Sequence, residues 1–220
     1  NPASPPAVSR YSELCGLAVT NTSYVQDNNA SDTRYRARFY VLDGLTGNGA
    51  IDIFVAYSNE GATTTLFKVA FDGSQFTFNA TGAGGGSTTA ASVNGWNVVE
   101  FDWDTGANTF RFWVNADATS ANATGSVDAG TGTVEAVRLG MPNGLSPQTG
   151  KLTFDAFESH RTTPVGELLA CDTNGNGSRT IADVVAVLNE LAGTLQVGQP
   201  DCNKNGGVTV ADAVSLINSL

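Results

Sequence analysis

From about residue 15 to residue 160, apolar and polar residues alternate in short runs that turn sequences separate. Alternation with a period of two predicts β-strands with one buried face, and Gly-containing dipeptides between such runs predict hairpin turns. Asp43-Gly44, Asp72-Gly73 and Asn94-Gly95 are turns of this kind. The expected strands cover residues 35–42, 51–57, 65–71, 75–79, 96–103, 109–115, 134–139 and 152–159. Many strands without a helical period predict a two-sheet antiparallel sandwich.

Near the C-terminus the apolar spacing changes to that of short helices. The first apolar set ends before Gly193 and consists of Ile181, Val184, Val185, Val187, Leu188 and Leu191. The second set consists of Val210, Val214, Leu216, Ile217 and Leu220. The sequence therefore predicts a mostly β chain that ends in a small α-helical domain.

Each predicted helix follows one copy of a repeated loop, residues 172–183 and residues 201–212. Both copies carry an oxygen-bearing side chain at loop positions 1, 3, 5, 9 and 12, and a Gly at position 6. This is the spacing of an EF-hand-type calcium loop, in which position 7 adds a backbone carbonyl and position 12 adds a carboxylate. The alternative is a pair of Asn- and Gly-rich turns that only cap the two helices.

The loops and their helices resemble the dockerin domains of secreted bacterial proteins, over residues 165–220. This resemblance implies two calcium ions. It implies side-chain ligands at Asp172, Asn174, Asn176, Thr180 and Asp183, and at Asp201, Asn203, Asn205, Thr209 and Asp212. Ser178 and Gly207 would add backbone carbonyls.

The loops also depart from the dockerin pattern. Position 5 is Asn in both loops, whereas dockerins usually have Asp there. Each site then holds two formal negative charges, which predicts weak binding with a Kd of about 10⁻⁴–10⁻³ M. Position 8 is Arg179 in the first loop and Val208 in the second, and positions 10 and 11 are Ile181-Ala182 and Val210-Ala211. Docking to a cohesin is therefore not implied.

Cys171 precedes the first loop, and Cys202 is position 2 of the second loop. In a pseudo-twofold pair of loops these positions face each other, so we expect a disulfide between them. The alternative is two unrelated thiols. If Cys171 and Cys202 form the disulfide, Cys15 is left either as a small buried apolar residue or as the partner in an intermolecular disulfide.

The chain has a net charge of −10, which argues against binding to nucleic acid or to an anionic membrane surface. No apolar run reaches the roughly 18 residues of a membrane span. A start at Asn1 without Met is expected of a secreted chain whose signal segment has been removed. The expected regions are a Pro-rich arm (1–13), the sandwich (14–161), a linker (162–166) and the calcium domain (167–220). Because the linker is short, the calcium domain should lean on the sandwich.

The sandwich carries aromatic strands in a characteristic order, including Tyr35-Arg-Ala-Arg-Phe-Tyr-Val, Gly95-Trp-Asn-Val-Val-Glu-Phe-Asp-Trp and Phe110-Arg-Phe-Trp-Val-Asn. Over about residues 14–161 it is similar to laminin-G-like modules of the concanavalin A-like lectin/glucanase superfamily. The resemblance implies a jelly roll that serves in binding or adhesion. It carries no catalytic signature.

Two groups of side chains on these strands are candidates for chemistry or binding. Glu100, Asp102 and Asp104 share one strand face, as the acids of some glucan hydrolases do, but Asp104 abuts a turn, and a solvated acidic face is the expected role. Alternation also places Trp113 and Arg111 on the outer face, where they form a possible ligand or interface site unless another segment covers them. Glu135 and Asp155 offer no better acidic partner, and His160 has no neighbouring nucleophile.

These observations predict a secreted, calcium-binding, non-catalytic interaction protein of the cell surface or an extracellular structure. Its partner would be a protein or a second copy of itself. The alternative is a lectin-like module that binds a polysaccharide, and a glycoside hydrolase is a remote alternative.

Overall fold

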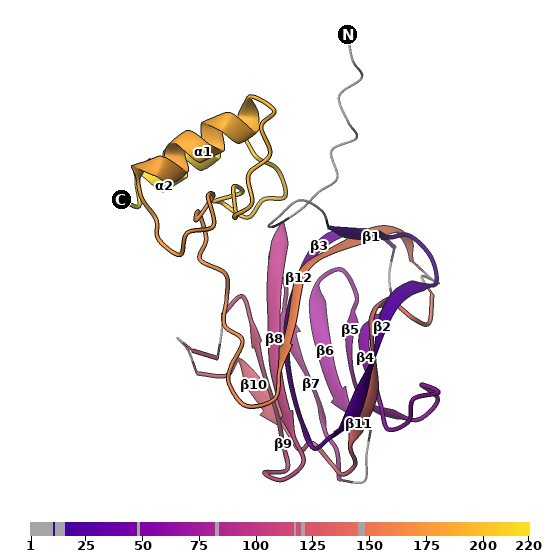
Figure 1. Ribbon diagram of the computed structural model, residues 1–220. Coiled ribbons are helices and arrows are strands. Elements are labelled where there is room, and N and C mark those ends of the chain that lie inside the picture. Colours follow the sequence, from indigo (N-terminus) through magenta and orange to yellow (C-terminus); the bar gives the residue numbers. More distant parts are fainter. Residues whose placement is uncertain are drawn as a thin grey trace.

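The computed structural model describes residues 11, 16–47, 49–81, 84–116, 118–119, 122–144 and 148–220. These residues form two six-stranded antiparallel sheets and two short helices (Figure 1). The strands of the first sheet, in spatial order, are β1 (Leu17–Val19), β12 (Thr149–His160), β3 (Arg34–Thr46), β8 (Trp96–Asp104), β9 (Thr109–Val114) and β10 (Gly125–Val127). The strands of the second sheet are β2 (Ser23–Asp32), β11 (Val134–Met141), β4 (Ile51–Tyr57), β5 (Thr65–Phe71), β6 (Gln75–Ala80) and β7 (Ser87–Ala91).

The predicted fold class, a mostly β two-sheet sandwich followed by a small helical region, is confirmed. The eight predicted strands correspond to β3, β4, β5, β6, β8, β9, β11 and β12. The expected N-terminal arm, apart from Tyr11, and the expectations for Cys15 lie outside the described residues.

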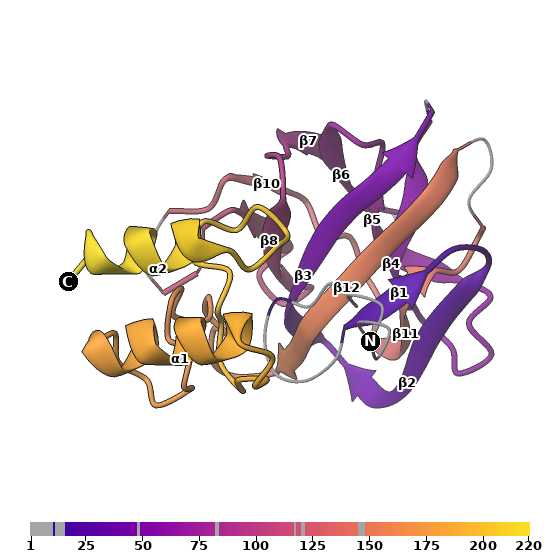
Figure 2. The ribbon, with the colours of Figure 1, turned by 90° about the horizontal axis from the view of Figure 1, so that it is seen from above.

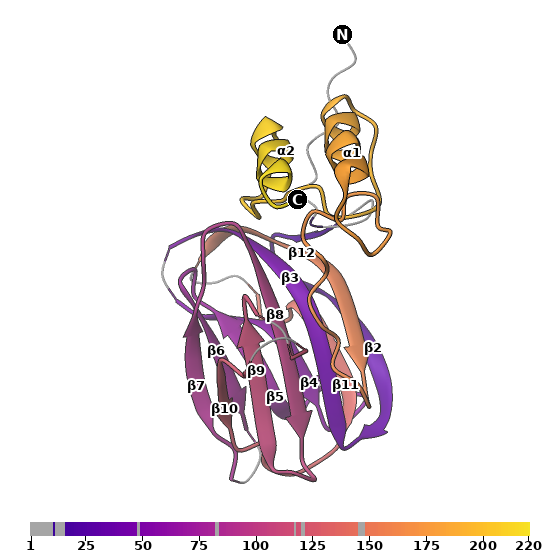
Figure 3. The same ribbon diagram turned by 90° about the vertical axis from the view of Figure 1, so that its left-hand side faces the viewer.

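The two sheets pack face to face around an aromatic core (Figure 3). The ring of Phe54 on β4 lies 4.9 Å from the ring of Phe101 on β8. Phe78 on β6 stacks on Phe112 on β9 with ring centroids 3.9 Å apart. Burial of each such side chain contributes about 1.5–3 kcal/mol. The inward positions expected from the alternation are buried: Val99, Phe101, Trp103, Phe110, Phe112 and Val114.

The residues that follow β12 lie against the outer face of the first sheet. Arg36 on β3 donates to the carbonyl oxygen of Thr162. Glu100 on β8 accepts from the backbone N–H groups of Val165 and Gly166. Figure 1 shows this orange segment running alongside the sandwich to the two helices. The linker is therefore held against the first sheet at several of its residues.

The C-terminal region consists of α1 (Ile181–Leu191) and α2 (Val210–Ile217), which lie side by side (Figure 2). Each helix starts with a Thr N-cap and an Asp at its third position, and each pair forms a reciprocal capping box. In the described part of the chain, no helix is long and apolar enough to cross a membrane.

Candidate metal sites

The first loop is closed by hydrogen bonds between its side-chain oxygens and its own backbone. Asp172 accepts from the N–H of Asn176 at 2.9 Å and from the N–H of Gly177 at 2.6 Å. The Asp183 carboxylate accepts from the N–H groups of Asn174 at 3.2 Å and Thr180 at 2.8 Å. Gly177 has a φ of +81°, which an L side chain rarely adopts, so the Gly at position 6 permits the turn.

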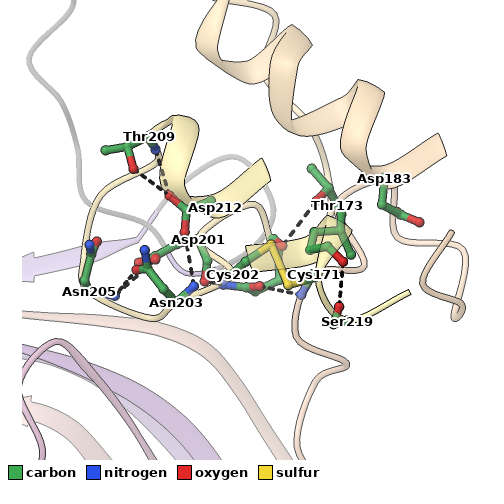
Figure 4. Close-up of a disulfide and its surroundings, with 12 residues drawn as sticks. Cys171, Thr173, Asp183, Asp201, Cys202, Asn203, Asn205, Thr209, Asp212 and Ser219 are labelled. Carbon is green, nitrogen blue, oxygen red and sulfur yellow. Dashed lines mark hydrogen bonds between the residues drawn. A yellow bond between two sulfur atoms is a disulfide. The ribbon is translucent and has the colours of Figure 1, made fainter. Parts of the chain in front are cut away.

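The second loop repeats this arrangement (Figure 4). Asp201 accepts from the N–H of Asn205 at 3.1 Å and from the N–H of Gly206 at 2.7 Å. The Asp212 carboxylate accepts from the N–H groups of Asn203 at 3.1 Å and Thr209 at 2.8 Å. The largest difference between a bond and its counterpart in the other loop is 2.9 Å against 3.1 Å. The two loops therefore share one backbone design as well as one sequence pattern.

The remaining predicted ligands belong to the same two networks. The amide oxygen of Asn176 accepts from the N–H of Ser178 at 2.9 Å, and that of Asn205 accepts from the N–H of Gly207 at 3.0 Å. Each Thr hydroxyl lies 3.1 Å from its Asp carboxylate. All the predicted members of a site therefore lie in one short, closed loop.

The four loop carboxylates are buried: Asp172, Asp183, Asp201 and Asp212. Among the described residues none of them forms an ion pair with Arg, Lys or His. Burial, together with the Asp212 carboxylate, raises the pKa of Asp201 to about 6. A buried carboxylate without a counter-charge is costly, and a bound cation would offset that cost by neutralising the two carboxylates of a loop.

The donors fit calcium better than a transition metal. Each loop offers two carboxylates, amide oxygens and a hydroxyl, which are the hard oxygen ligands that calcium takes. No group of three or more His, Cys, Asp or Glu side chains suited to a metal is found within the described residues. The residues present therefore fit a weakly charged calcium loop.

The predicted Cys171–Cys202 disulfide is present, with Cα atoms 4.8 Å apart. Gln199, which we did not single out in the sequence, reinforces this junction. Its side-chain oxygen accepts from the N–H of Cys171 at 2.8 Å, and its side-chain nitrogen donates to the carbonyl oxygen of Asp201. The buried Gln199 therefore connects the start of one loop to the start of the other.

The helices place only part of their apolar residues in the small core. Val184, Val187, Ala213 and Leu216 pack with Cys171, whereas a second face of each helix is exposed. The exposed positions are 49–67% accessible and are equivalent in the repeat: Ile181 and Val210, Val185 and Val214, Leu188 and Ile217. We call these the apolar stripes of α1 and α2.

Two acidic residues of β8, Glu100 and Asp104, accept hydrogen bonds from backbone N–H groups of neighbouring segments. Glu100 is 1% exposed, and besides its bonds to the linker it accepts from the N–H of Ala118 at 3.0 Å. The expected solvated acidic face is therefore wrong, because the linker and the loop after β9 cover it. Asp104 accepts from the N–H of Ala107 at 3.0 Å, as a turn-capping residue does.

Asp102 lies at the centre of an arginine cluster. It is 2.7 Å from both Arg34 and Arg111 and 3.2 Å from Arg36. Burial alone would raise the pKa of Asp102, but the hydrogen bond from Arg34 and the charges of Arg36 and Arg34 hold it below its usual range. Asp102 is therefore a buried anion that holds three arginine side chains together on the outer face of the first sheet.

Trp113 does lie on the outer face, but it is only 5% exposed, so its ring offers no open stacking surface. Its possible role as a ligand platform is therefore wrong, and the covered alternative holds. Arg111 keeps a partly exposed side chain that pairs with Asp102.

The other titratable residues considered in the sequence, His160, Asp155 and Glu135, each have a hydrogen-bond partner in the fold. His160 contacts Glu158 at 2.9 Å and the carbonyl oxygen of Pro164 at 3.2 Å. Asp155 accepts from the N–H of Tyr11 at 2.6 Å, and Glu135 accepts from the hydroxyl of Ser31 at 3.3 Å.

No protein-family model and no curated protein matches the chain. Solved structures that resemble it include three sandwich-containing binding domains. The CBM40 of a Ruminococcus gnavus sialidase, bound to α2,3-sialyllactose, is 11% identical with a TM-score of 0.47, over 67% of this chain and 90% of that one. The botulinum neurotoxin type G receptor-binding domain is 10% identical with a TM-score of 0.43, over 66% of this chain and 42% of that one.

The serotype D ligand-binding domain, in complex with N-acetylneuraminic acid, is 8% identical with a TM-score of 0.48, over 66% of this chain and 38% of that one. The chain thus spans about two fifths of the length of the toxin domains. Similarity at this level carries no argument about the ligand, and the sandwich assignment rests on the strand topology itself.

Proposed function

We propose that the two loops each bind one calcium ion and that the chain acts as a secreted, non-catalytic interaction protein. The supporting observation is the duplicated hydrogen-bond network around buried, unpaired carboxylates. A helix cap needs only Thr180 and Asp183. It does not account for Asp172, Asn174 and Asn176, whose oxygens are also held in place by the loop backbone.

In each loop, two Asp residues would supply the negative charges of the calcium site. Asp172 and Asp201 supply one charge at position 1, and their bonds to backbone N–H groups hold that carboxylate in place. Asp183 and Asp212 supply the second charge from the first turn of the following helix. A bound calcium ion would neutralise both carboxylates and so stabilise the loop and the start of the helix. Calcium therefore has a structural role in this proposal.

The apolar stripes of α1 and α2 supply the interaction surface. Large exposed apolar patches often mark protein interaction sites. The stripes lie on the helices whose first turns contain the position-12 carboxylates, Asp183 and Asp212. A protein partner or a second copy of the chain fits such a surface. Calcium would then keep the helices in the arrangement that the partner contacts.

The test is calcium titration by calorimetry together with thermal unfolding. We expect two ions per chain with a Kd of about 10⁻⁴–10⁻³ M. About 10 mM calcium should then stabilise the C-terminal region by about 1.4–2.7 kcal/mol per site. The Asp172→Asn/Asp201→Asn double variant should lose both binding events.

A double variant with the same charge change, Asp27→Asn/Asp128→Asn, is the control, because both side chains are exposed and far along the chain from the loops. It should bind calcium like the native chain. The proposal would be overturned if calorimetry detected no heat of calcium binding, or if a chelator left the thermal unfolding curve unchanged.

Glycan binding by the sandwich is a second candidate. The observation in its favour is a mostly polar pocket between β3 and two neighbouring turns, lined by Asp43, Gly73, Ser74, Ser92, Val93, Asn94 and Gly95. Closely spaced carboxylate, hydroxyl and amide groups are suited to hydrogen bonding with sugar hydroxyls. The test is a glycan array that includes neutral sugars together with sialyllactose and N-acetylneuraminic acid, which two of the similar structures hold. Binding that Asp43→Asn abolishes would support this candidate, and an array without signal would eliminate it.

A further inference from the structure

The two loops are alike in themselves but differ in what surrounds them. A Cβ built at Gly177 in the first loop meets no atom within 4 Å. A Cβ at Gly206, the equivalent position of the second loop, would lie 3.0 Å from the side chain of Leu42 on β3. The second loop thus packs on the end of the sandwich, and the equivalent turn of the first loop does not.

Lys204, at position 4 of the second loop, makes the central contact. Its carbonyl oxygen accepts from the N–H of Trp96, the first residue of β8, at 2.8 Å. Its ammonium group pairs with Glu167, the residue that directly follows the linker. A Cβ on Gly95 would overlap that same carbonyl oxygen, so the approach is close enough to require Gly at this turn. We call the Trp96–Lys204 hydrogen bond and its neighbours the docking contact.

The docking contact rests on a buried aromatic cluster. Tyr11 stacks on Tyr40 with ring centroids 3.7 Å apart and meets Trp96 edge-on at 5.6 Å. The hydroxyl of Tyr40 accepts from the N–H of Leu168 at 2.8 Å. These rings are fully buried, so the sandwich side of the contact is closely packed. We therefore expect movement at the interface to come from the loop.

The shape of the loop at Lys204 depends on the proposed calcium ligands. Lys204 lies between Asn203 and Asn205, has a φ of +58°, and donates its N–H to the carbonyl oxygen of Asp201 at 3.2 Å. The next N–H, that of Asn205, bonds to the Asp201 carboxylate. The direction of the Lys204 carbonyl is thus set by closure of the loop around Asp201. Without a cation, two buried carboxylates in this loop repel each other and oppose that closure.

Building on the proposed calcium sites, we propose that the second loop is a calcium-dependent lock between the helices and the sandwich, and that the first loop is not part of it. Calcium in the second loop holds the Lys204 carbonyl against Trp96. Its loss frees the helices, with their apolar stripes, from a fixed orientation on the sandwich. Since coupling between two sites is reciprocal, docking must in turn strengthen calcium binding at the second loop.

The repeat supplies matched variants for the test. Asp172→Ala and Asp201→Ala remove the same ligand from the first and the second loop. The readout is hydrogen exchange at the Trp96 N–H, which donates to Lys204 and so reports docking directly. We expect Asp201→Ala and chelator to accelerate this exchange at least about fivefold, and Asp172→Ala to leave it within twofold of the native rate.

The reciprocal test leaves the loop intact. Gly95→Ala places a methyl group against the Lys204 carbonyl, whereas Gly73→Ala imposes the same backbone strain at a φ of +92° with no atom closer than 3.9 Å. In an Asp172→Ala background, where only the second loop binds calcium, Gly95→Ala should weaken binding at least about fivefold. Gly73→Ala should leave the affinity unchanged.

The two proposals fail in different ways. If neither loop binds calcium, the proposed function is wrong and the lock falls with it. If both loops bind calcium but chelator leaves exchange at Trp96 unchanged, or Gly95→Ala leaves the affinity of the second loop unchanged, the lock alone is wrong. Equal exchange in Asp172→Ala and Asp201→Ala would also overturn it.

Discussion

Replacing Glu100 with Ala should destabilise the sandwich and release the linker. The carboxylate of Glu100 accepts from the N–H of Val165 at 2.9 Å, the N–H of Gly166 at 3.2 Å and the N–H of Ala118 at 3.0 Å. Arg38 donates to the carbonyl oxygen of Gly166 at 2.8 Å, so both ends of that residue are held by one sheet face. Truncation to Ala removes one side of this arrangement.

The magnitude follows from the donors left without an acceptor. A buried unsatisfied N–H costs about 1–3 kcal/mol, and the bond to Gly166 is buried. The bonds to Val165 and Ala118 are partly buried, so water can replace the carboxylate at a smaller cost of about 0.5–1 kcal/mol each. The expected loss is therefore about 2–5 kcal/mol in the free energy of unfolding. That is a large part of the roughly 5–15 kcal/mol typical of a domain.

Urea denaturation of the full chain measures the loss, and limited proteolysis reports cleavage within residues 161–168. Glu100→Gln should lie between the native chain and Glu100→Ala, because one oxygen is kept while the amide nitrogen faces other donors. Glu135→Ala is the control, since its carboxylate accepts from one exposed hydroxyl at 3.3 Å. If Glu100→Ala stays within about 0.5 kcal/mol of the native chain and its linker resists protease, the structural role assigned to Glu100 is wrong.

Two further outcomes concern the C-terminal region. The Cys171→Ser/Cys202→Ser double variant removes the disulfide, which joins two residues 31 apart in sequence. In the chain-entropy model, this loss lowers the free energy of unfolding of the C-terminal region by about 3.7 kcal/mol. A native-like denaturation midpoint would contradict this prediction. Because the fold raises the pKa of Asp201 from 3.8 to about 6, the calcium-free fold favours the protonated form. Its stability should therefore fall by up to about 3 kcal/mol as the pH rises from about 4 to above 6. Urea titrations without calcium across this range measure the change, and a rise in stability would refute it.

The strands that the sequence predicts are those that bury one face. β4 and β5 have aromatic and β-branched residues at inward positions, and the alternation places both correctly. β2 has no alternation to detect, because it is a sheet edge with mostly exposed polar residues on both faces. β7 contains only Ser, Thr and Ala, and β1 and β10 have three residues each, so none of them has a usable hydrophobic pattern.

For the helices, the sequence predicts that they exist but not which face is buried. Val184 and Val185 are adjacent and equally apolar, yet Val184 is buried and Val185 is exposed. Only the position of the partner helix and the disulfide decides between them. The same limit applies to Glu100, whose partners lie 65 and 66 residues further along the chain. In contrast, the loop ligands are local in sequence, so their spacing alone places them together.

The contacts of the linker imply that the sandwich, as an autonomous folding unit, extends beyond its last strand. A fragment that stopped with the last strand, β12, would leave Arg36, Arg38 and Glu100 facing solvent without their backbone partners at residues 162–166. It would also lose the N–H that the hydroxyl of Tyr40 accepts from Leu168. An expression fragment of the sandwich should therefore extend through Leu168. The residues that look like a spacer in the sequence are an integral part of the module that precedes them.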